Sequence, residues 1–257
     1  MSKLICGNIF LPMRRMPSHK AEMVSQALFG ETIRVTDELT GWVKIETEFD
    51  GYSGWSDKNH LIHYEIPEGL QEFVLSRSLE CITEAGTKLV VGPGSEIYEP
   101  DFQRKAFKAG DRLFSVIGEF NESFIIPEGQ IHETALRFLN TPYLWGGRSI
   151  YGLDCSGFVQ LVYKIHGVKI PRDAGKQAET GEVIGFVKDA RPGDLAYFDD
   201  EKGRIVHVGM ILPGNMIIHS SGYVRTDKLD HQGIFRLDIN DYSHKLRVIK
   251  RVEGLTV

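Results

Sequence analysis

The chain has 257 residues, of which 42% are hydrophobic and 25% are charged, and its formal net charge is −5. This length is sufficient for two or three domains, and the acidic balance, without a run of lysine and arginine among aromatic residues, argues against a nucleic-acid-binding protein. No apolar run reaches the roughly 18–20 residues that span a bilayer, so we expect neither nucleic acid nor membrane as a partner.

The amino-terminal segment lacks the pattern of a secretory signal. Residues 4–7 faintly resemble a lipoprotein cleavage site, but Asn8 and Pro12 interrupt the apolar core of about 7–15 residues that a signal needs. We interpret residues 5–11 as a first β-strand and predict a cytoplasmic protein. The three cysteines are odd in number and widely spaced, so no disulfide framework is expected.

Residues 1–65 have the pattern of a small β-barrel. Alternating apolar and polar residues predict strands at 31–35 and 42–45, and residues 50–55 place turn formers between aromatics. Residues 13–27 are predicted to be a short helical or loop excursion. Short strands between Gly and Asp turns are typical of a five-stranded barrel of roughly 60 residues.

Residues 66–128 repeat this pattern and predict a second small barrel. Strands are expected at 79–83, 88–91 and 110–116. Residues 121–126 are expected to take the place that the second strand pair has in the first barrel. The internal similarity between the two segments is too weak to prove that they are copies of one barrel.

The pattern changes near Pro127, and a third domain is predicted at 129–257. Its first helix is expected at 131–139, with Ala135, Leu136 and Leu139 spaced for burial. A glycine-rich turn follows, then a helix from Cys155 to about His166, and strands at 195–198, 204–212 and 215–219. A helix followed by antiparallel strands is typical of the α+β class.

Cys155 is the candidate nucleophile. Asp154 is a good N-cap residue, so Cys155 is expected in the first turn of a buried helix. A helix N-terminus stabilises a thiolate over a thiol, and we therefore predict a lowered pKa for Cys155. Cys6 and Cys81 are expected to be small, unreactive core residues.

Two of the nine histidines are candidates for the catalytic base. His207 lies in an apolar strand and His219 ends the next one, at equal distances from Pro213, where we expect a hairpin. Cross-strand neighbours on one face are about 5 Å apart, so one imidazole can orient the other. A single histidine in an apolar strand is more often a core residue, but the mirrored pair downstream of a capped cysteine favours catalysis.

Zinc coordination by Cys155, His207 and His219 is the alternative for the same residues. Such a site would leave one coordination position open, but no locally spaced pair of ligands supports it. We expect no metal and no cofactor.

Five motifs together resemble those of the NlpC-type cell-wall cysteine peptidases, which have a papain-like fold. They are Thr141 to Gly147, Leu153 to Phe158, Pro171 to Ala174 with Gln177, Arg191 to Leu195, and His207 to Gly209. The resemblance covers roughly 130–240 and implies a triad of Cys155 as nucleophile, His207 as general base and His219 as orienting residue. The backbone amide of Cys155 would help to form the oxyanion hole, with Tyr143 nearby.

The two predicted barrels extend the resemblance to a subgroup with bacterial SH3-like barrels. Such enzymes hydrolyse the bond between D-γ-glutamate and a diamino acid in peptidoglycan peptides. Two barrels without an export signal imply recycling of free murein peptides in the cytoplasm, with release of L-Ala-D-Glu from peptides whose N-terminal L-Ala is unblocked.

The resemblance also implies a pocket for the substrate ammonium group. Asp154, with Ser156 beside it, would bind the ammonium, and Glu31 and Tyr52, each in a barrel turn, are candidates for the opposite wall. Related enzymes often have Ser after Arg-Asp, where this chain has Ala174. This departure places one hydrogen bond to the substrate amine in question.

Other functions remain open at this point. An amidase, an acyltransferase or an endopeptidase of the same fold could act on another bond or on intact cell wall, and an inert domain could bind wall peptides. The presence of Cys155 and both histidines argues against the inert domain. The sequence leaves open the preferred diamino acid and the oligomeric state, with a monomer as the working expectation.

Overall fold

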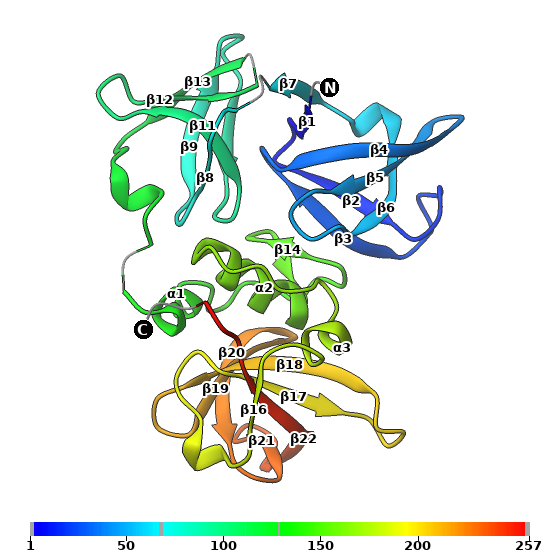
Figure 1. The fold of residues 1–257 in the computed structure, drawn as a ribbon, viewed down its shortest axis with the longest axis vertical. Coiled ribbons are helices and arrows are strands. Elements are labelled where there is room, and N and C mark those ends of the chain that lie inside the picture. Colours follow the sequence, from blue (N-terminus) through cyan, green and yellow to red (C-terminus); the bar gives the residue numbers. More distant parts are fainter. Residues whose placement is uncertain (1–2, 67–68, 111, 128, 255–257) are drawn as a thin grey trace. The chain divides into compact units, whose positions relative to one another are not determined.

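The computed structural model describes residues 3–66, 69–110, 112–127 and 129–254 (Figure 1). The chain divides into two compact units, residues 1–127 with 146–149 and residues 128–145 with 150–257, whose relative placement is not determined. Residues 146–149, which we expected in the third domain, therefore group with the first unit. No helix in the described ranges is long and apolar enough to cross a membrane.

The first unit begins with a seven-stranded antiparallel sheet in the order β3-β2-β6-β5-β4-β1-β7. Its strands are β1 (Lys3–Cys6), β2 (Phe10–Arg14), β3 (Met23–Leu28), β4 (Thr32–Leu39), β5 (Trp42–Thr47), β6 (Ser53–Asp57) and β7 (His63–Ile66), with a 3-10 turn, η1 (Lys58–His60), before β7. The strands predicted at 31–35 and 42–45 are confirmed by β4 and β5.

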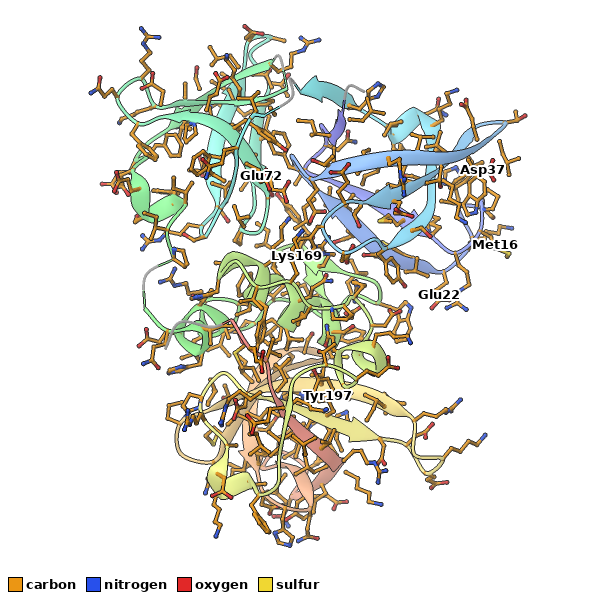
Figure 2. The ribbon with its side chains drawn as sticks, in the orientation of Figure 1. Met16, Glu22, Asp37, Glu72, Lys169 and Tyr197 are labelled. Carbon is orange, nitrogen blue, oxygen red and sulfur yellow. The ribbon has the colours of Figure 1, made fainter. Side chains whose placement is uncertain are left out.

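One expectation for this sheet was wrong, and another was confirmed in one of its two alternatives. The single strand predicted at 5–11 is broken by a bend at residues 7–9, where the Asn8 side chain hydrogen-bonds to the backbone of His60 and Ile62. Of the two alternatives for residues 13–27, a short helix or a loop, the loop is found: it connects the end of β2 to β3 and is exposed at Met16 (Figure 2). The error at 5–11 arises because Asn8, a turn former, lies inside an otherwise apolar stretch.

The second sheet has six antiparallel strands in the order β10-β9-β13-β12-β11-β8. They are β8 (Glu72–Val74), β9 (Leu79–Thr83), β10 (Lys88–Val91), β11 (Glu96–Asp101), β12 (Ala106–Ala109) and β13 (Arg112–Ile117). β9 and β10 were predicted within these bounds, and β13 covers the end of the strand predicted at 110–116; Asp111 lies outside the described residues. Residues 121–126 form a 3-10 turn, η2 (Glu122–Phe124), instead of the predicted strand pair, because the Asn121 side chain caps it at the Ser123 amide.

The first sheet has its own hydrophobic core, and a second core joins Ile5 and Phe29 of the first sheet's segment to the second sheet. Phe29, which follows β3, packs edge-on against Phe114 of β13, with ring centroids 5.3 Å apart. The Tyr98 hydroxyl donates a hydrogen bond of 2.9 Å to the Gly30 carbonyl. Gly30 has φ 77°, and a Cβ at this position would overlap the Glu96 carbonyl, so the junction requires glycine.

Within its described residues, 129–145 and 150–254, the second unit contains three α-helices and a seven-stranded sheet in the order β16-β22-β17-β18-β19-β20-β21. Its elements are α1 (Ile131–Leu136), β15 (Gly152–Leu153), α2 (Cys155–Ile165), α3 (Ala174–Gln177), β16 (Glu182–Ile184), η3 (Val187–Asp189), β17 (Leu195–Asp199), β18 (Ile205–Leu212), β19 (Met216–Ser221), β20 (Tyr223–Leu229), β21 (Gly233–Arg236) and β22 (Asp241–Arg251); β14 (Arg148–Ser149) belongs to the first unit. β21 also pairs with β22, so six of the strands form a closed ring.

The helices of the second unit pack on its sheet, with α2 against β18 and β19. Tyr197 of β17, labelled in Figure 2, is fully buried, as is Tyr163 of α2. α1 is shorter than the helix predicted at 131–139: Ala135 is buried as expected, but Leu136 and Leu139 are exposed because the helix ends at Leu136.

Candidate active site

The amino-terminal end of α2 places Cys155 at its first residue. The Asp154 side chain caps the helix, and its Oδ1 accepts a hydrogen bond of 2.7 Å from the Gly157 amide. All residues of α2 are buried, and Cys155 itself is 8% exposed. The predicted cap and helix start are confirmed.

The thiol of Cys155 does not have the lowered pKa that we predicted. Burial raises its pKa to about 12, and the neighbouring Asp154 carboxylate adds to the increase. Backbone hydrogen bonds from Val208 and Ser156, together with the charge of Arg172, act in the opposite direction but are outweighed. The resting thiol is therefore protonated, and it needs a base to become a nucleophile.

His207 and His219 lie on one face of the β18–β19 hairpin and contact each other. The Nε2 atom of His207 is 2.7 Å from Nδ1 of His219, and both rings are buried. The backbone contact between Val208 and the Cys155 thiol places the nucleophile beside the strand that carries His207. The structure thus brings together the three residues that we proposed as a triad.

The register of this hairpin differs from the one we predicted. Gly209, not His207, lies opposite His219, because three residues separate the last pair, Leu212 and Met216. Gly214 and Asn215 in that turn both have left-handed backbone conformations. A shift of two residues keeps the same face of a strand, so the imidazoles remain neighbours on a diagonal instead of directly across.

Asp227 of β20 is the residue that sequence reasoning missed. Its Oδ2 atom lies 3.0 Å from Nε2 of His219, and Arg225 contacts the same carboxylate at 2.7 and 2.9 Å. Burial acts to raise the pKa of Asp227, but the hydrogen bonds from His219 and Arg225 outweigh it and lower this pKa. Asp227 could have been found by pairing the strand after β19 with β19 in the same way as we paired β18 with β19, because that strand begins directly after β19.

Both histidines are neutral in the resting site. Burial, followed by the proximity of His244 and His219, lowers the pKa of His207 well below its ordinary value. Burial also lowers the pKa of His219, although the hydrogen bond to Asp227 opposes this effect. A neutral imidazole has one bare nitrogen and can accept a proton from the thiol.

His244 of β22 stacks on His207, with ring centroids 4.1 Å apart and an interplanar angle of 22°. Ring nitrogens of His207, His219 and His244 lie within 4.8 Å of one another, which raises the question of a metal site. A ligated ion must lie near the plane of each imidazole, and two rings stacked face to face cannot both direct a lone pair at one ion. The stacking therefore favours a packing role for His244 over metal ligation.

Asp154 and Ser156 form a buried cluster with Arg172. The guanidinium donates two hydrogen bonds to the Asp154 carboxylate, at 3.0 and 2.6 Å, and one of 2.9 Å to the Ser156 hydroxyl. Gln177 of α3 donates to the Ser156 carbonyl at 3.1 Å. The carboxylate that we predicted to bind the substrate ammonium is thus already compensated by Arg172, to which we had assigned no role.

Tyr143 lies beside this cluster. Its amide donates a hydrogen bond of 3.0 Å to the Gly222 carbonyl, and its backbone pairs with Leu153 as an isolated bridge. Burial raises the pKa of the Tyr143 phenol to about 12, and the nearby Cys155 and Asp154 add to the increase. The phenol is therefore a neutral hydrogen-bond donor close to Cys155.

Glu31 and Tyr52, the other two predicted binding residues, belong to the first unit. Glu31 is fully buried, not an exposed turn residue; its carboxylate pairs with Arg148 at 3.0 Å and accepts from the Leu28 amide at 2.8 Å. Tyr52 is half-buried and packs on the core of the first sheet. These contacts position both residues within their unit but do not relate them to Cys155.

A buried cysteine at a helix start, beside a strand that carries a histidine pair, is the arrangement of a cysteine hydrolase. The sequence profile of the NlpC/P60 family matches residues 140–238, and that of the bacterial dipeptidyl-peptidase SH3 domain matches residues 13–61. The chain belongs to the NlpC/P60 family of peptidases and is an enzyme, a hydrolase.

Curated relatives cover most of the chain. The gamma-D-glutamyl-L-lysine dipeptidyl-peptidase of Bacillus subtilis is 33% identical over 219 residues, which is 76% of this chain and 71% of the relative. Dipeptidyl-peptidase 6 of Lysinibacillus sphaericus is 26% identical over 253 residues, covering 87% and 90%. A solved NlpC/P60 family protein from Bacillus cereus has the same fold, with a TM-score of 0.81 at 20% identity, covering 98% of this chain and all of that one.

Proposed function

We propose that the enzyme hydrolyses the bond between D-γ-glutamate and a diamino acid in murein peptides that have a free N-terminal L-Ala, and so releases L-Ala-D-Glu. The names of the relatives support this substrate class. The observation that carries the catalytic part is the 2.7 Å contact between His207 and His219, because the backbone of Val208, the residue after His207, contacts the Cys155 thiol.

In the proposed reaction, Cys155 Sγ attacks the γ-carbonyl carbon while its proton passes to His207. The resulting oxyanion accepts a hydrogen bond from the backbone amide of Cys155, with the Tyr143 hydroxyl nearby. His207 then gives the proton to the departing amine as the C–N bond breaks, which leaves a thioester on Cys155. Water, deprotonated by His207, attacks the thioester and releases the acyl product and the thiol.

The electrostatics favour proton transfer during the attack over a preformed ion pair. The raised pKa of Cys155 and the lowered pKa of His207 both hold the resting pair in its neutral form. Charge then develops only when the substrate carbonyl is present to receive the sulfur. The backbone amides at the start of α2 and the imidazole pair stabilise that charge where it forms.

The ammonium of the substrate is proposed to bind at the cluster of Asp154, Ser156 and Arg172. Because Arg172 already compensates the charge of Asp154, the ammonium would share this carboxylate with the guanidinium and would also donate a hydrogen bond to the Ser156 hydroxyl oxygen. Ala174, at the start of α3, supplies no hydroxyl for this pocket.

We extend the proposal to the organisation and location of the enzyme. Residues 66–128 would be a second SH3-like barrel after a first at 1–65, and the catalytic domain at 129–257 would be papain-like; their sheets and helices are compatible with this interpretation. The enzyme would act as a monomer on free peptides during cytoplasmic murein recycling. Cell fractionation and size-exclusion chromatography test these points.

The experiment is a cleavage assay on L-Ala-γ-D-Glu-diaminopimelate and on its L-Lys counterpart, with products identified by mass spectrometry. We expect L-Ala-D-Glu from the intact protein, none from Cys155→Ala, and normal turnover from the control Cys81→Ala, which removes a thiol that is buried in the first unit. Acetylating the substrate amine should stop cleavage. Undiminished hydrolysis of the acetylated peptide would overturn the recycling proposal, and cleavage of purified cell wall in its place would favour the wall endopeptidase.

A further inference from the structure

We propose that Asp227 is a positioning residue that fixes the tautomers of both histidines, so that the bare nitrogen of the resting base is Nδ1 of His207. This inference rests on the proposed catalytic roles of Cys155 and His207. It concerns a residue that touches neither of the reacting atoms and acts through His219.

The first step is the carboxylate. Asp227 is buried, and Arg225 holds it with contacts to both oxygens. Arg225 is held in turn by Asp238, at 3.1 and 3.3 Å. A carboxylate held by a guanidinium stays ionised and can only accept hydrogen bonds. The Nε2 atom of His219, 3.0 Å from Oδ2, must therefore carry a hydrogen.

The second step passes this information through the first ring. His219 is fully buried and neutral, so it carries one hydrogen, and that hydrogen is on Nε2. Its Nδ1 is then a bare acceptor. Because His207 Nε2 lies 2.7 Å from that acceptor, it must be the donor of this hydrogen bond.

The third step gives the state of the base. His207 is also buried and neutral, so with its hydrogen on Nε2 its Nδ1 is bare. The two strands that carry the rings fix their orientation, and the stack on His244 holds the plane of His207. Nδ1 of His207 is thus the nitrogen that can receive the thiol proton. The Asp227 carboxylate determines this tautomer of His207 through the ring of His219.

Among the residues that the structure describes, the charged and titratable groups placed around His219 include one carboxylate, that of Asp227. The charged and titratable groups around the His219 ring are His207, His244, Asp227, Arg225 and Arg236. The two arginines are donors only, and His244 presents a ring at 5.8 Å and an angle of 85°. Asp227 is therefore the group in this set that can select the Nε2–H form.

The test combines nitrogen NMR of the imidazoles with kinetics. In the ¹⁵N-histidine-labelled protein, long-range ¹H–¹⁵N spectra should show the Nε2–H tautomer for both His207 and His219. An Nδ1–H tautomer of His219 in the unmodified protein would overturn the proposal, whether or not any variant folds and whether or not murein peptides are substrates.

The variant Asp227→Asn should fold and lose the tautomer preference, because an amide can present either a donor or an acceptor to Nε2. We expect kcat to fall by about 10²-fold with KM little changed, since general-base catalysis contributes roughly 10²–10⁴-fold. Asp227→Glu, which keeps a carboxylate, should recover part of the loss. The control Asp200→Asn removes a carboxylate that pairs with Arg204 on an exposed turn and should leave kcat unchanged.

Two further outcomes are decisive. If Asp227→Asn keeps full kcat, Asp227 does not position the base. If the enzyme proves inactive on murein peptides, alkylation of Cys155 by iodoacetamide replaces the kinetic readout, because it also requires deprotonation of the thiol. Equal alkylation rates in the Asp227→Asn variant and the unmodified protein would then refute the proposal.

Discussion

Gly209 leaves the space that the second imidazole needs, and Gly209→Ala should disable the site from a position that bears no chemical group. A Cβ at this position would lie 2.9 Å from the Cβ of His219 and 2.8 Å from Cδ1 of Ile217. Ordinary contacts begin at 3.4 Å, so each neighbour must move by about half an ångström. Ile217 can adjust its terminal methyl, but His219 is tied at both ring nitrogens.

The expected cost of this overpacking is about 1–3 kcal/mol of unfolding free energy. The displaced ring should also break or lengthen its 2.7 Å contact with His207, and a misplacement of about 1 Å can reduce kcat by 10²-fold. The assay is steady-state peptide cleavage together with thermal unfolding, and the control is Gly185→Ala, where an added Cβ meets nothing within 4 Å. Unchanged kcat in a folded Gly209→Ala variant would refute the reasoning.

Three further predictions follow from the electrostatics. The pKa values of His207, His219 and His244 lie below the ordinary 6.5, so below that pH the unfolded chain binds more protons than the folded chain. The free energy of unfolding should therefore be retained above pH 6.5 and fall toward pH 5. A melting temperature that does not change between pH 7.5 and 5 would contradict this prediction. Arg172→Met removes the bidentate partner of the buried Asp154 and should lower the free energy of unfolding, measured in denaturant, by about 3–5 kcal/mol. The double variant Arg172→Met/Asp154→Asn should lose less unfolding free energy, because no unpaired charge stays buried. Equal losses in the two variants would contradict the ion-pair argument. Burial raises the pKa of Cys6, Cys81 and Cys155 alike to about 12, so a base is needed to activate Cys155. His207→Ala should therefore slow iodoacetamide labelling of Cys155, whereas labelling of Cys6 and Cys81 should not change, as mass spectrometry of the labelled peptides can show; an unchanged rate at Cys155 would contradict this.

The sequence was most informative where one element determines its own pattern. The α2 helix was predicted because Asp154 supplies a local cap and the following apolar residues recur at helical spacing. The strands β4, β5, β17 and β18 were predicted because alternation or apolar runs between turn residues are equally local. These elements also carry the nucleophile and the base, so the main site residues could be named in advance.

Properties that depend on several elements could not be predicted. The hairpin register depends on a three-residue turn in which Gly214 and Asn215 have left-handed conformations. The length of this turn could not be predicted from the sequence. The raised pKa of Cys155 follows from burial; the sequence indicated a buried helix, but not that burial would outweigh the effect of the helix start on this pKa. Arg172 comes from a segment whose proximity to the site exists only after folding, whereas Asp227 lies on the strand next to β19 and could have been found only by pairing a third strand.

The core shared by the two sheets of the first unit limits how this part of the chain can be exchanged in evolution. The SH3 profile ends near residue 61, yet Phe29 from within the matched segment is packed among phenylalanines of the second sheet. If the SH3 segment were transferred to another protein without the second sheet, Phe29 would lose its packing partners and become an exposed aromatic side chain. Residues 13–61 and their neighbouring sheet are therefore expected to be inherited together, as one recombination block.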